Sequence, residues 1–580
     1  RALTTGRRFC VIEKKKNRIE ILGIAMLVLL ISGVCMIPCF KTGLPYGDDQ
    51  QVHMLRVESI LKALKSGQGY PVYIYQTMLE GYGYGMGIFY PDLFLLPAVL
   101  FRLLGASPEI AMKIYIYVLM ICTGLTAYYT GRSIGRSRCA GVVTMVLYTM
   151  GHYHLEDVYT RFALGEIAAM VFIPLAFLAL YDLTEMGHSR KGLLCVSYSC
   201  LMLSHTISFV LCVVMGIIWV CARWKRIAAC RRLIGAVCME ALACAVLTCY
   251  YWLPVLEQFA DGRFYVSNEP AFYTHEETQT LLAIVSGKYS VAFIEIGILA
   301  LMVFVSIYKK VYNKKALMCL VTAAVLLVCE TKIFPWKLID RTPFVSIQFP
   351  WRLNMFTEFF VALGLALQSV DIIKLLPSYR RNACLCAAGS ILIGIFSLNM
   401  VWNIELGGYV NYPEGYADNA GSTDSIGFWE WLPAEGDLAT SVGAESSGMV
   451  KCEDTYIRGR YGSDGSYEFD AGKTAGECIV PKYYYKGYEA IMADGRKLTV
   501  SKCLNDGLVE ISVSPEAGKV VVKYKGTKIQ HWSWRISISA VLLMLLILIM
   551  QHAVEKGKIQ SYMEWWSNYG KKENQVKKNC

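Results

Sequence analysis

The segment "GDDQQVHMLRVESILKALKSG" (residues 47–67) decides the fold, because it follows closely on residues 19–40, an apolar run long enough to cross a bilayer. Similar runs of roughly 14–25 residues recur along the chain, which is about the length needed to cross ~30 Å of hydrocarbon. The chain has 580 residues, 55% of them hydrophobic and 18% charged, and a mean hydropathy of +0.39. This composition excludes an ordinary soluble domain and a disordered chain. The sequence therefore predicts a polytopic α-helical protein of the plasma membrane, with the lipid bilayer as its environment.

Lysine and arginine produce the net charge of +11, and they gather beside the apolar runs. The basic clusters lie at residues 7–18, 132–138, 223–232, 309–315, 374–381 and 571–578. Such clusters are typical of cytoplasmic loops, so we expect the N-terminal residues 1–18 and the tail 553–580 in the cytoplasm. No basic patch stands apart from an apolar run, and we therefore expect no nucleic-acid partner.

Charge also decides whether residues 91–104 cross the membrane. If this stretch and 108–130 both crossed, the basic loop at 132–138 would lie outside, against the positive-inside rule. The two prolines, the aspartate and the arginine of "YPDLFLLPAVLFRLL" also suit an interfacial or re-entrant helix better than a span. We therefore expect 41–107 to form one external loop.

The resulting topology has roughly 12 crossings of bilayer-spanning length. They are predicted at residues 19–40, 108–130, 139–151, 165–183, 192–204, 206–222, 233–253, 291–308, 316–330, 353–370, 384–402 and 533–551. Residues 192–222 could instead form one long bent helix. The first crossing is too long for a signal-peptide core and lacks an A-x-A site, which predicts an uncleaved anchor. A membrane domain thus covers 19–402, and a last helix covers 531–552.

Residues 403–530 differ from the rest of the chain. They are polar and rich in Gly, Tyr and Asp, and "KLTVSKCLNDGLVEISVSPEAGKVVVKYKG" alternates with period two. The turn signals "ADG", "NDG" and "EAG" separate the predicted strands. This pattern predicts a small external β-sandwich of about a hundred residues. Cys452, Cys478 and Cys503 lie within it, and one pair could be bridged in an oxidising compartment.

Four polar side chains of the opening segment are expected to share one region of a short helix. Helical spacing puts Asp49, His53 and Arg56 on one side, with Asp48 at its edge. An interfacial helix whose acidic start caps its own N-terminus would explain the pattern. The alternative is a functional site at the membrane face, because acids are few in the membrane half and two adjoin here.

Several stretches resemble the GT-C glycosyltransferase fold. They are "DDQQVHMLRVESILKALKSGQGYP", "GYGYGMGIFYPDLFLLPAVLF", "DVYTRFALGEIAAMVFIPLAFLAL", "LSHTISFVL", "IQFPWRLNMF" and "GFWEWLP". The resemblance covers most of the chain, including the β-domain, and is closest to a bacterial membrane family labelled "6-pyruvoyl-tetrahydropterin synthase-related", whose relatives are called YfhO-like. It implies a transferase that works on the external face with a polyprenyl-phosphate-linked sugar as donor and a cell-envelope glycan or protein as acceptor.

The resemblance also implies a catalytic base, an aspartate of the first external loop. This is Asp49, with Asp48 as the alternative. An acceptor hydroxyl needs a general base, and a carboxylate near a membrane surface can be tuned for that role. The lipid phosphate that leaves carries charge that Arg or Lys can stabilise, and Arg161 and Arg352 are the candidates. Arg352 could instead be a snorkelling residue of an interfacial aromatic belt.

The predicted substrate-binding residues are His53, Arg56, Arg161, Glu166, His205, Gln348, Trp351 and Arg352. "QFPW" could stack on a sugar, although interfacial aromatic residues are the default explanation. A hydrogen bond between packed helices explains His205 as well as a substrate contact does. His154 with Asp157 or Glu156 could hold a divalent metal, and solvated loop polarity is the simpler interpretation.

Two other functions fit parts of the sequence. A transporter or flippase for a lipid-linked substrate would need charged residues deep in its spans, whereas the charged residues here gather at predicted external ends. A non-catalytic envelope protein that kept the fold would retain the same hydrophobic scaffold, with the β-domain as a binding module.

Overall fold

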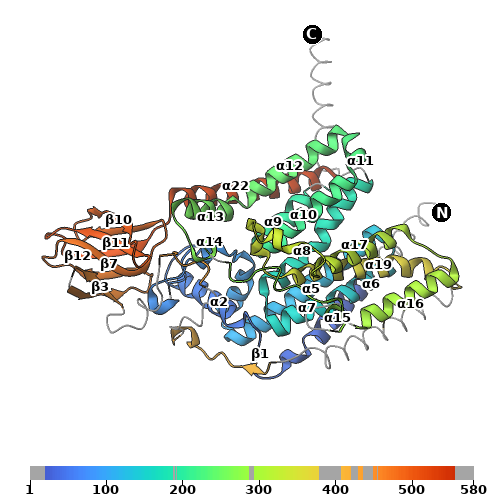
Figure 1. The fold of residues 1–580 in the computed structure, drawn as a ribbon, viewed down its shortest axis with the longest axis horizontal. Helices are drawn as coiled ribbons and strands as arrows, with labels where there is room; N and C mark the ends of the chain where they lie inside the picture. Colours follow the sequence, from blue (N-terminus) through green and yellow to red (C-terminus); the bar gives the residue numbers. More distant parts are fainter. Residues whose placement is uncertain are drawn as a thin grey trace, which may run out of the picture.

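The protein is described from a computed structural model. The structure describes residues 20–76, 78–186, 190, 192–268, 270–286, 293–377, 389, 407–419, 429–435, 448–453 and 455–555. Figure 1 shows an elongated molecule, with a bundle of helices over most of its length and a β-sandwich at one end. Apart from Gly389, the predicted crossing at 384–402 lies outside the described residues, as do the basic residues 1–18 and most of the tail.

The helical part begins with a helix at Glu20–Cys35. The further α-helices are α2 (Gln50–Lys65), α3 (Met86–Phe89), α4 (Leu96–Leu103), α5 (Pro108–Gly135), α6 (Arg138–Thr149), α7 (His152–Glu156), α8 (Leu164–Tyr181), α9 (Leu193–Ser204), α10 (Thr206–Ala222), α11 (Trp224–Ala228), α12 (Arg231–Leu247), α13 (Cys249–Asp261), α14 (Tyr265–Asn268), α15 (Leu281–Ser286), α16 (Phe293–Lys309), α17 (Lys314–Cys329), α18 (Trp336–Ile339), α19 (Asn354–Ile373) and α22 (Lys528–Glu555). Short 3-10 or π turns lie at Ile37–Phe40, Leu79–Gly81, Leu93–Leu95, Asp157–Arg161, Asp182–Met186, Pro343–Ile347, Pro350–Leu353 and Tyr416–Asn419.

Four helices within the described residues are long and apolar enough to cross a membrane. They run over Pro108–Gly135, Leu164–Met186, Pro350–Ile373 and Lys528–Ala553. Helices α12 and α13 would make a fifth span if they are counted as one, although they meet at an angle of 69°. Several of the other predicted crossings are apolar helices of shorter length, so the predicted count of roughly 12 is not confirmed.

The helices of the membrane part contact one another through a small residue in one place and through aromatic rings in another. A Cβ on Gly131 of α5 would lie only 2.3 Å from Oγ1 of Thr144 on α6, so glycine allows these two helices to approach. Phe177 of α8 stacks on Phe359 of α19, with 5.6 Å between ring centroids. This contact fixes the positions of α8 and α19 relative to each other. The N-terminal ends of both helices carry the candidate site.

The structure answers two questions that the sequence left open: whether residues 91–104 form a crossing, and whether residues 192–222 form one helix or two. The stretch 91–104 forms an apolar helix over Leu93–Leu103, which is too short to cross a bilayer alone. Residues 192–222 form two helices, α9 and α10, which are separated at His205. The extended backbone of His205 ends the first helix, and its side chain caps the second.

The β-rich region consists of two antiparallel five-stranded sheets that share a buried core. Their orders are β10-β11-β7-β3-β4 and β5-β6-β12-β8-β9. The strands are β3 (Met449–Cys452), β4 (Thr455–Arg458), β5 (Arg460–Tyr461), β6 (Tyr467–Asp470), β7 (Gly476–Tyr483), β8 (Tyr488–Met492), β9 (Lys497–Leu498), β10 (Val500–Lys502), β11 (Leu508–Val513) and β12 (Lys519–Tyr524). Period-two burial over most of β11 and in β12 confirms the alternation seen in the sequence. A disulfide joins Cys452 to Cys478, which lie opposite each other on β3 and β7.

The sandwich begins later than the predicted boundary at 403. Within 407–435, the described residues lie along the membrane part: β2 (Tyr409–Val410) pairs with β1 (Leu44–Pro45), and Glu414 binds Arg102 of α4 at 2.8 Å. The first sandwich strand is β3. The polar composition extends over all of residues 403–530, whereas the period-two alternation that predicts strands occurs only in the later part of this range.

Candidate active site

Backbone hydrogen bonds join the Asp48–Asp49 turn to the segment that ends in Arg161. The amide of Asp48 donates to the Thr160 carbonyl at 3.1 Å, and the amide of Asp49 donates to the Arg161 carbonyl at 2.8 Å. Gly47 permits this approach, because a Cβ at that position would lie 2.6 Å from Cβ of Phe162. Two loops that are far apart in sequence therefore hold the predicted base and one predicted phosphate ligand together.

The Asp49 carboxylate is not used to cap the helix that it precedes. Asp49 stands at the N-cap of α2, yet its side chain accepts no capping hydrogen bond. The residue is accessible to water. Its pKa is nevertheless raised, because the surrounding protein disfavours the charged form more than Arg161 and Arg352 favour it. The Asp49 carboxylate is therefore surrounded by protein and still accessible to water. The explanation from the sequence, that it caps its own helix, does not hold.

Arg161, Glu166 and Arg352 form a buried ionic cluster next to Asp49. Glu166 Oε1 accepts from Nη2 of Arg161 at 2.8 Å and from Nε of Arg352 at 2.9 Å. Arg161 also pairs with Asp157, and Tyr153 donates its hydroxyl to Glu166 Oε2 at 2.7 Å. Because each arginine is held by a carboxylate, both guanidinium groups are fixed in position while buried.

The guanidinium groups of Arg161 and Arg352 each pack against an aromatic ring. The Arg161 guanidinium lies 4.4 Å from the centroid of the Trp351 ring, and Trp351 stacks on Phe349 at 4.7 Å. Arg352 lies 5.0 Å from the Phe349 ring. Trp351 is buried, so it is not part of an exposed aromatic belt, and Arg352 is likewise too buried to be a snorkelling residue. Both alternatives from the sequence are therefore wrong for this pair.

Glu430 is a member of the site that the sequence interpretation did not include. Its Oε1 accepts from Nε2 of Gln348 at 2.9 Å, while Oε1 of Gln348 accepts from Nη1 of Arg352 at 3.0 Å. Burial raises the pKa of Glu430, although Arg352 acts in the opposite direction. Gln348 has φ 61° and ψ −57°, an unfavourable conformation for a non-glycine residue that is often found at functional sites. The one signal in the sequence was an acid between two tryptophans in "GFWEWLP".

His53 and Arg56 occupy a different environment from Asp49. They contact each other, with 3.3 Å between Nδ1 of His53 and Nη1 of Arg56, and both are buried. Arg56 lies over the Tyr90 ring at 4.0 Å and donates to the Pro91 carbonyl at 2.8 Å. Burial and the charge of Arg56 lower the pKa of His53 well below its ordinary value, so the imidazole is neutral at pH 7. These two residues hold the "FYP" segment, and their predicted contact with substrate gains no support.

The remaining predicted site residues, His205, His154 and Asp157, make contacts within the protein. His205 caps α10, since its Nδ1 accepts from the Ser208 amide at 3.3 Å, a structural role that differs from the hydrogen bond between packed helices considered from the sequence. The His154 ring binds the Thr149 carbonyl at 3.0 Å, and Asp157 pairs with Arg161. The part of the chain that the structure describes contains no group of three or more His, Cys, Asp or Glu side chains that could hold a metal ion. The metal prediction for His154 and Asp157 therefore gains no support.

Comparison with known proteins found similar structures and one similar sequence. Two cryo-EM structures of arabinofuranosyltransferase AftD from mycobacteria, one of them of a mutant, match with TM-scores of 0.40 and 0.41 at 14% and 13% identity. Each match covers 67% of this chain, which spans 27% and 28% of the AftD chains. An uncharacterised protein of Lactococcus lactis subsp. cremoris (strain MG1363) is 22% identical over 92% of this chain and 95% of its own length. A family model matches residues 12–338, more than half of the sequence, and the chain therefore belongs to the family of unknown function DUF6541.

Proposed function

We propose that this protein is a membrane glycosyltransferase of the GT-C type. It would move a sugar from a polyprenyl-phosphate-linked donor to a glycan or protein acceptor of the cell envelope. The sequence motifs that resemble this fold suggest the reaction class. The observation that carries the proposal is the accessible, uncapped carboxylate of Asp49 beside the guanidinium groups of Arg161 and Arg352.

Asp49 would serve as the general base. The acceptor hydroxyl attacks the anomeric carbon of the donor sugar, its proton passes to the Asp49 carboxylate, and the bond between the sugar and the phosphate oxygen breaks. The electron pair of that bond leaves with the lipid phosphate. A raised pKa makes Asp49 a stronger base than an ordinary aspartate, which suits proton removal from a hydroxyl.

Arg352 would stabilise the departing phosphate. Within the described residues, its Nε and Nη1 donate to Glu166, Ile347 and Gln348, whereas Nη2 makes no hydrogen bond. A guanidinium that is already held in place by protein partners can offer its remaining donors to a phosphate at little entropic cost. Arg161 would add positive charge from the other side of Glu166.

The location of the site also supports a lipid-linked donor. Glu166 lies in the first turn of α8, and Arg352 lies just before α19, so the site is at the N-terminal ends of two helices that are long enough to cross a membrane. Helix N-termini favour anions, and the phosphate of a polyprenyl lipid lies at the surface of the bilayer. A donor whose lipid tail stays in the membrane could thus present its phosphate to Arg352.

Asp49→Asn tests this proposal directly. Asparagine is close in shape to aspartate but cannot accept the proton, so sugar transfer should be lost while expression and the melting temperature in detergent stay nearly unchanged. Transfer is measured by mass spectrometry of envelope glycans from strains that carry the wild-type or the variant full-length chain.

Asp48→Asn is the matched control, because Asp48 is the adjacent exposed carboxylate. We expect it to keep most of the transfer activity. If Asp48→Asn abolishes transfer while Asp49→Asn retains it, the base is Asp48. If both variants transfer normally, the proposed mechanism is wrong.

A further inference from the structure

Glu430 is the carboxylate of the candidate site that has no role in the proposed transfer step. Within the described residues, Gln348 is the one side chain that donates to it, with 2.9 Å between Nε2 and Oε1. The residue is only partly buried, which leaves it open to a ligand. Burial raises the pKa of Glu430 and the charge of Asp49 raises it further, so the two carboxylates lie near each other. Glu430 therefore offers the site a hydrogen-bond acceptor for a ligand.

Trp431, the next residue, anchors the backbone beside Glu430. Its amide donates to the Tyr84 hydroxyl at 3.3 Å, and its carbonyl accepts from the Tyr485 hydroxyl at 3.0 Å. Its ring stacks on Phe89, with 4.9 Å between the ring centroids. These contacts come from the first external loop and from the sandwich, so two parts of the protein fix the position of Glu430.

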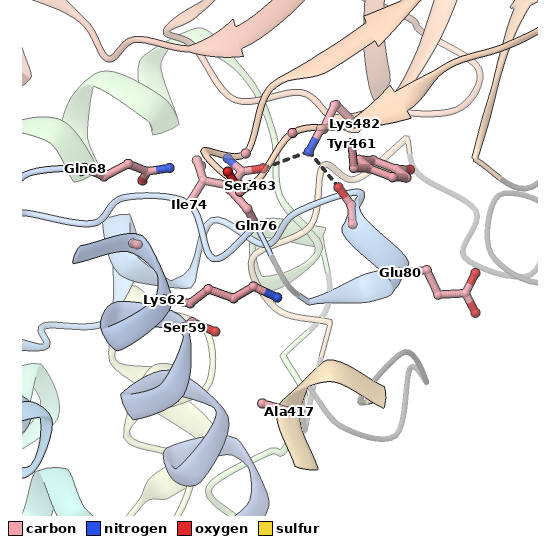
Figure 2. A pocket seen from close by; sticks show the side chains of 14 residues that line it. Ser59, Lys62, Gln68, Ile74, Gln76, Glu80, Ala417, Tyr461, Ser463 and Lys482 are labelled. Atoms are coloured by element: carbon pink, nitrogen blue, oxygen red, sulfur yellow. Dashed lines mark hydrogen bonds between the residues drawn. The ribbon is translucent and has the colours of Figure 1, made fainter. Parts of the chain in front are cut away.

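The same two parts also bind each other directly. The Tyr483 amide donates to the Tyr82 carbonyl at 3.1 Å, and Nζ of Lys482 donates to Oε1 of Gln76 at 2.9 Å. Figure 2 shows the contact of Lys482 with Gln76, at the wall of a pocket of about 600 Å³. The support beneath Glu430 is therefore rigid, and a side chain that is held in position binds a ligand at less entropic cost.

Gln348 connects Glu430 to the guanidinium group that would hold the donor phosphate. Its Nε2 donates to Glu430, and its Oε1 accepts from Nη1 of Arg352 at 3.0 Å. A single side-chain amide thus separates the carboxylate from Arg352. The sugar of a lipid-linked donor is bonded directly to the phosphate, so its hydroxyl groups would lie within a similar reach of Arg352. The unfavourable backbone of Gln348 holds its amide between the two charged groups.

The chemistry of a carboxylate distinguishes between the parts of such a donor. Its oxygens accept hydrogen bonds from the hydroxyl groups of a sugar. Its negative charge repels a phosphate or an acidic sugar, and the nearby charge of Asp49 adds to this effect. Glu430 and Arg352 therefore suit different parts of one molecule, the hydroxyl groups and the phosphate.

We infer that Glu430 binds hydroxyl groups of the donor sugar while Arg352 holds the donor phosphate, and that Glu430 thereby selects an uncharged sugar. The inference rests on the proposed function, because a lipid-linked donor is what would place a sugar beside the phosphate at Arg352. A site built to bind a hydroxyl group discriminates against a ligand that lacks it, since the protein group is then left without its partner. Loss of Glu430 should therefore impair recognition of the sugar and not of the lipid phosphate.

Lipid binding to the full-length protein in detergent tests the inference. The probes are the polyprenyl-phosphate-linked sugars extracted from membranes of the producing strain, and the same extract after mild acid, which removes the sugar and leaves polyprenyl phosphate. Native mass spectrometry measures which lipid is bound and gives its mass. We expect the wild-type protein to prefer the sugar-linked lipid by about tenfold or more.

Glu430→Ala should abolish this preference and leave the affinity for polyprenyl phosphate within about twofold of wild type. Glu430→Gln keeps an oxygen for the Gln348 amide, and it serves if the alanine variant disturbs Arg352. It should lower the preference less than the alanine variant, because hydrogen bonds to an uncharged amide are weaker than those to a carboxylate.

Glu435→Ala is the matched control, since Glu435 belongs to the same segment but binds Lys502 of the sandwich at 2.8 Å. It should keep the wild-type preference. An unchanged preference in Glu430→Ala would overturn the inference. Equal loss of both lipids in Glu430→Ala and Glu430→Gln would show that Glu430 only supports Arg352, and would also overturn it. Retention of a lipid whose mass corresponds to an acidic sugar would contradict the selection of an uncharged one.

The transferase proposal fails by a different result. Asp49→Asn should bind the sugar-linked lipid with the wild-type preference, so a failure of that proposal would be seen as retained transfer in this variant. The preference measured for Glu430→Ala decides the present inference.

Discussion

Glu166 is the residue on which the geometry of the candidate site depends. One of its oxygens accepts hydrogen bonds from both Arg161 and Arg352, and the other accepts from Tyr153. A carboxylate in this position neutralises two buried guanidinium groups at once and holds them at a fixed distance from each other. The site therefore needs Glu166 for its structure even though Glu166 need not touch the reacting atoms.

Glu166→Gln should be strongly destabilising. The amide keeps the shape of the side chain but removes the negative charge, which leaves Arg352 without its ion pair in a buried environment. Breaking a buried ion pair costs about 3–5 kcal/mol, so the melting temperature of the detergent-extracted protein should fall and transfer should be lost.

Glu489→Gln is the control for this substitution, because Glu489 pairs with Lys497 on the exposed face of the sandwich. That change should cost less than about 1 kcal/mol. Equal melting temperatures for Glu166→Gln and wild type would contradict the view that Glu166 maintains the arginine pair.

The sequence predicts part of this residue-scale arrangement. Asp49, Arg161 and Arg352 are charged residues at the ends of apolar runs, and the structure brings them together. Tyr153 and Glu430 could not be predicted, because their roles depend on contacts between segments far apart in the chain. The periodicity argument also grouped His53 with Asp49, whereas the structure buries His53 and leaves Asp49 exposed.

At the scale of elements, the sequence did not determine which of the sandwich cysteines form the disulfide. The three sandwich cysteines allowed several pairings, and the register of β3 against β7 sets Cys452 opposite Cys478, while Cys503 is free. Strand register depends on tertiary packing, so cysteine spacing alone could not choose among the pairings.

Loss of this disulfide should destabilise the sandwich. A bridge between residues 26 positions apart restricts the unfolded chain, and a loop of this size contributes about 3 kcal/mol. In the full-length protein, the double variant Cys452→Ser and Cys478→Ser should therefore melt at a lower temperature and be cut sooner by protease. Cys503→Ala, which leaves the bridge intact, should show little of this effect. Equal protease sensitivity of the two proteins would contradict a stabilising role of the bridge.

The helices show where a hydropathy argument reaches its limit. Apolar runs correctly locate α6 and α9, but these helices have lengths of only 12 residues each. Helix ends depend on capping and on tertiary packing, as at His205, and the bend between α12 and α13 lies within one apolar run. Apolar content therefore predicts the positions of helices better than it predicts complete crossings.

At the scale of the whole molecule, the basic segments 132–138 and 223–232, both within the described residues, lie at one end of the helical part. Glu20, at the start of the first described helix, lies 3.7 Å from Arg132 at the end of α5. Arg223 binds Glu185 at 2.9 Å, just beyond α8. Asp49 instead contacts Arg161 just before the N-terminus of α8, the opposite end of the helix from Glu185. Figure 1 also shows α11 far from the β-strands. This separation of charge supports the proposed orientation, in which the basic end faces the cytoplasm.

The disulfide supports the same orientation, because such bonds persist in oxidising compartments outside the cytoplasm. Arg136, an exposed residue of the basic loop after α5, and Lys473, an exposed residue of the sandwich, should then lie on opposite sides of the membrane. Each can be replaced by cysteine in the full-length chain and tested with a membrane-impermeant maleimide, with the parent chain as the background for its own cysteines.

Intact cells should label Lys473→Cys, whereas Arg136→Cys should react only after the membrane is permeabilised. The physical reason is the ion pair between Glu20 and Arg132, which puts the start of the first helix and the end of α5 at one end of the molecule, so that the Leu93–Leu103 helix between them does not complete a crossing. If Arg136→Cys is labelled in intact cells, the basic loop lies outside against the positive-inside rule. In that case the orientation of every later helix is inverted, and Asp49 and the sandwich no longer share the external face with a lipid-linked donor.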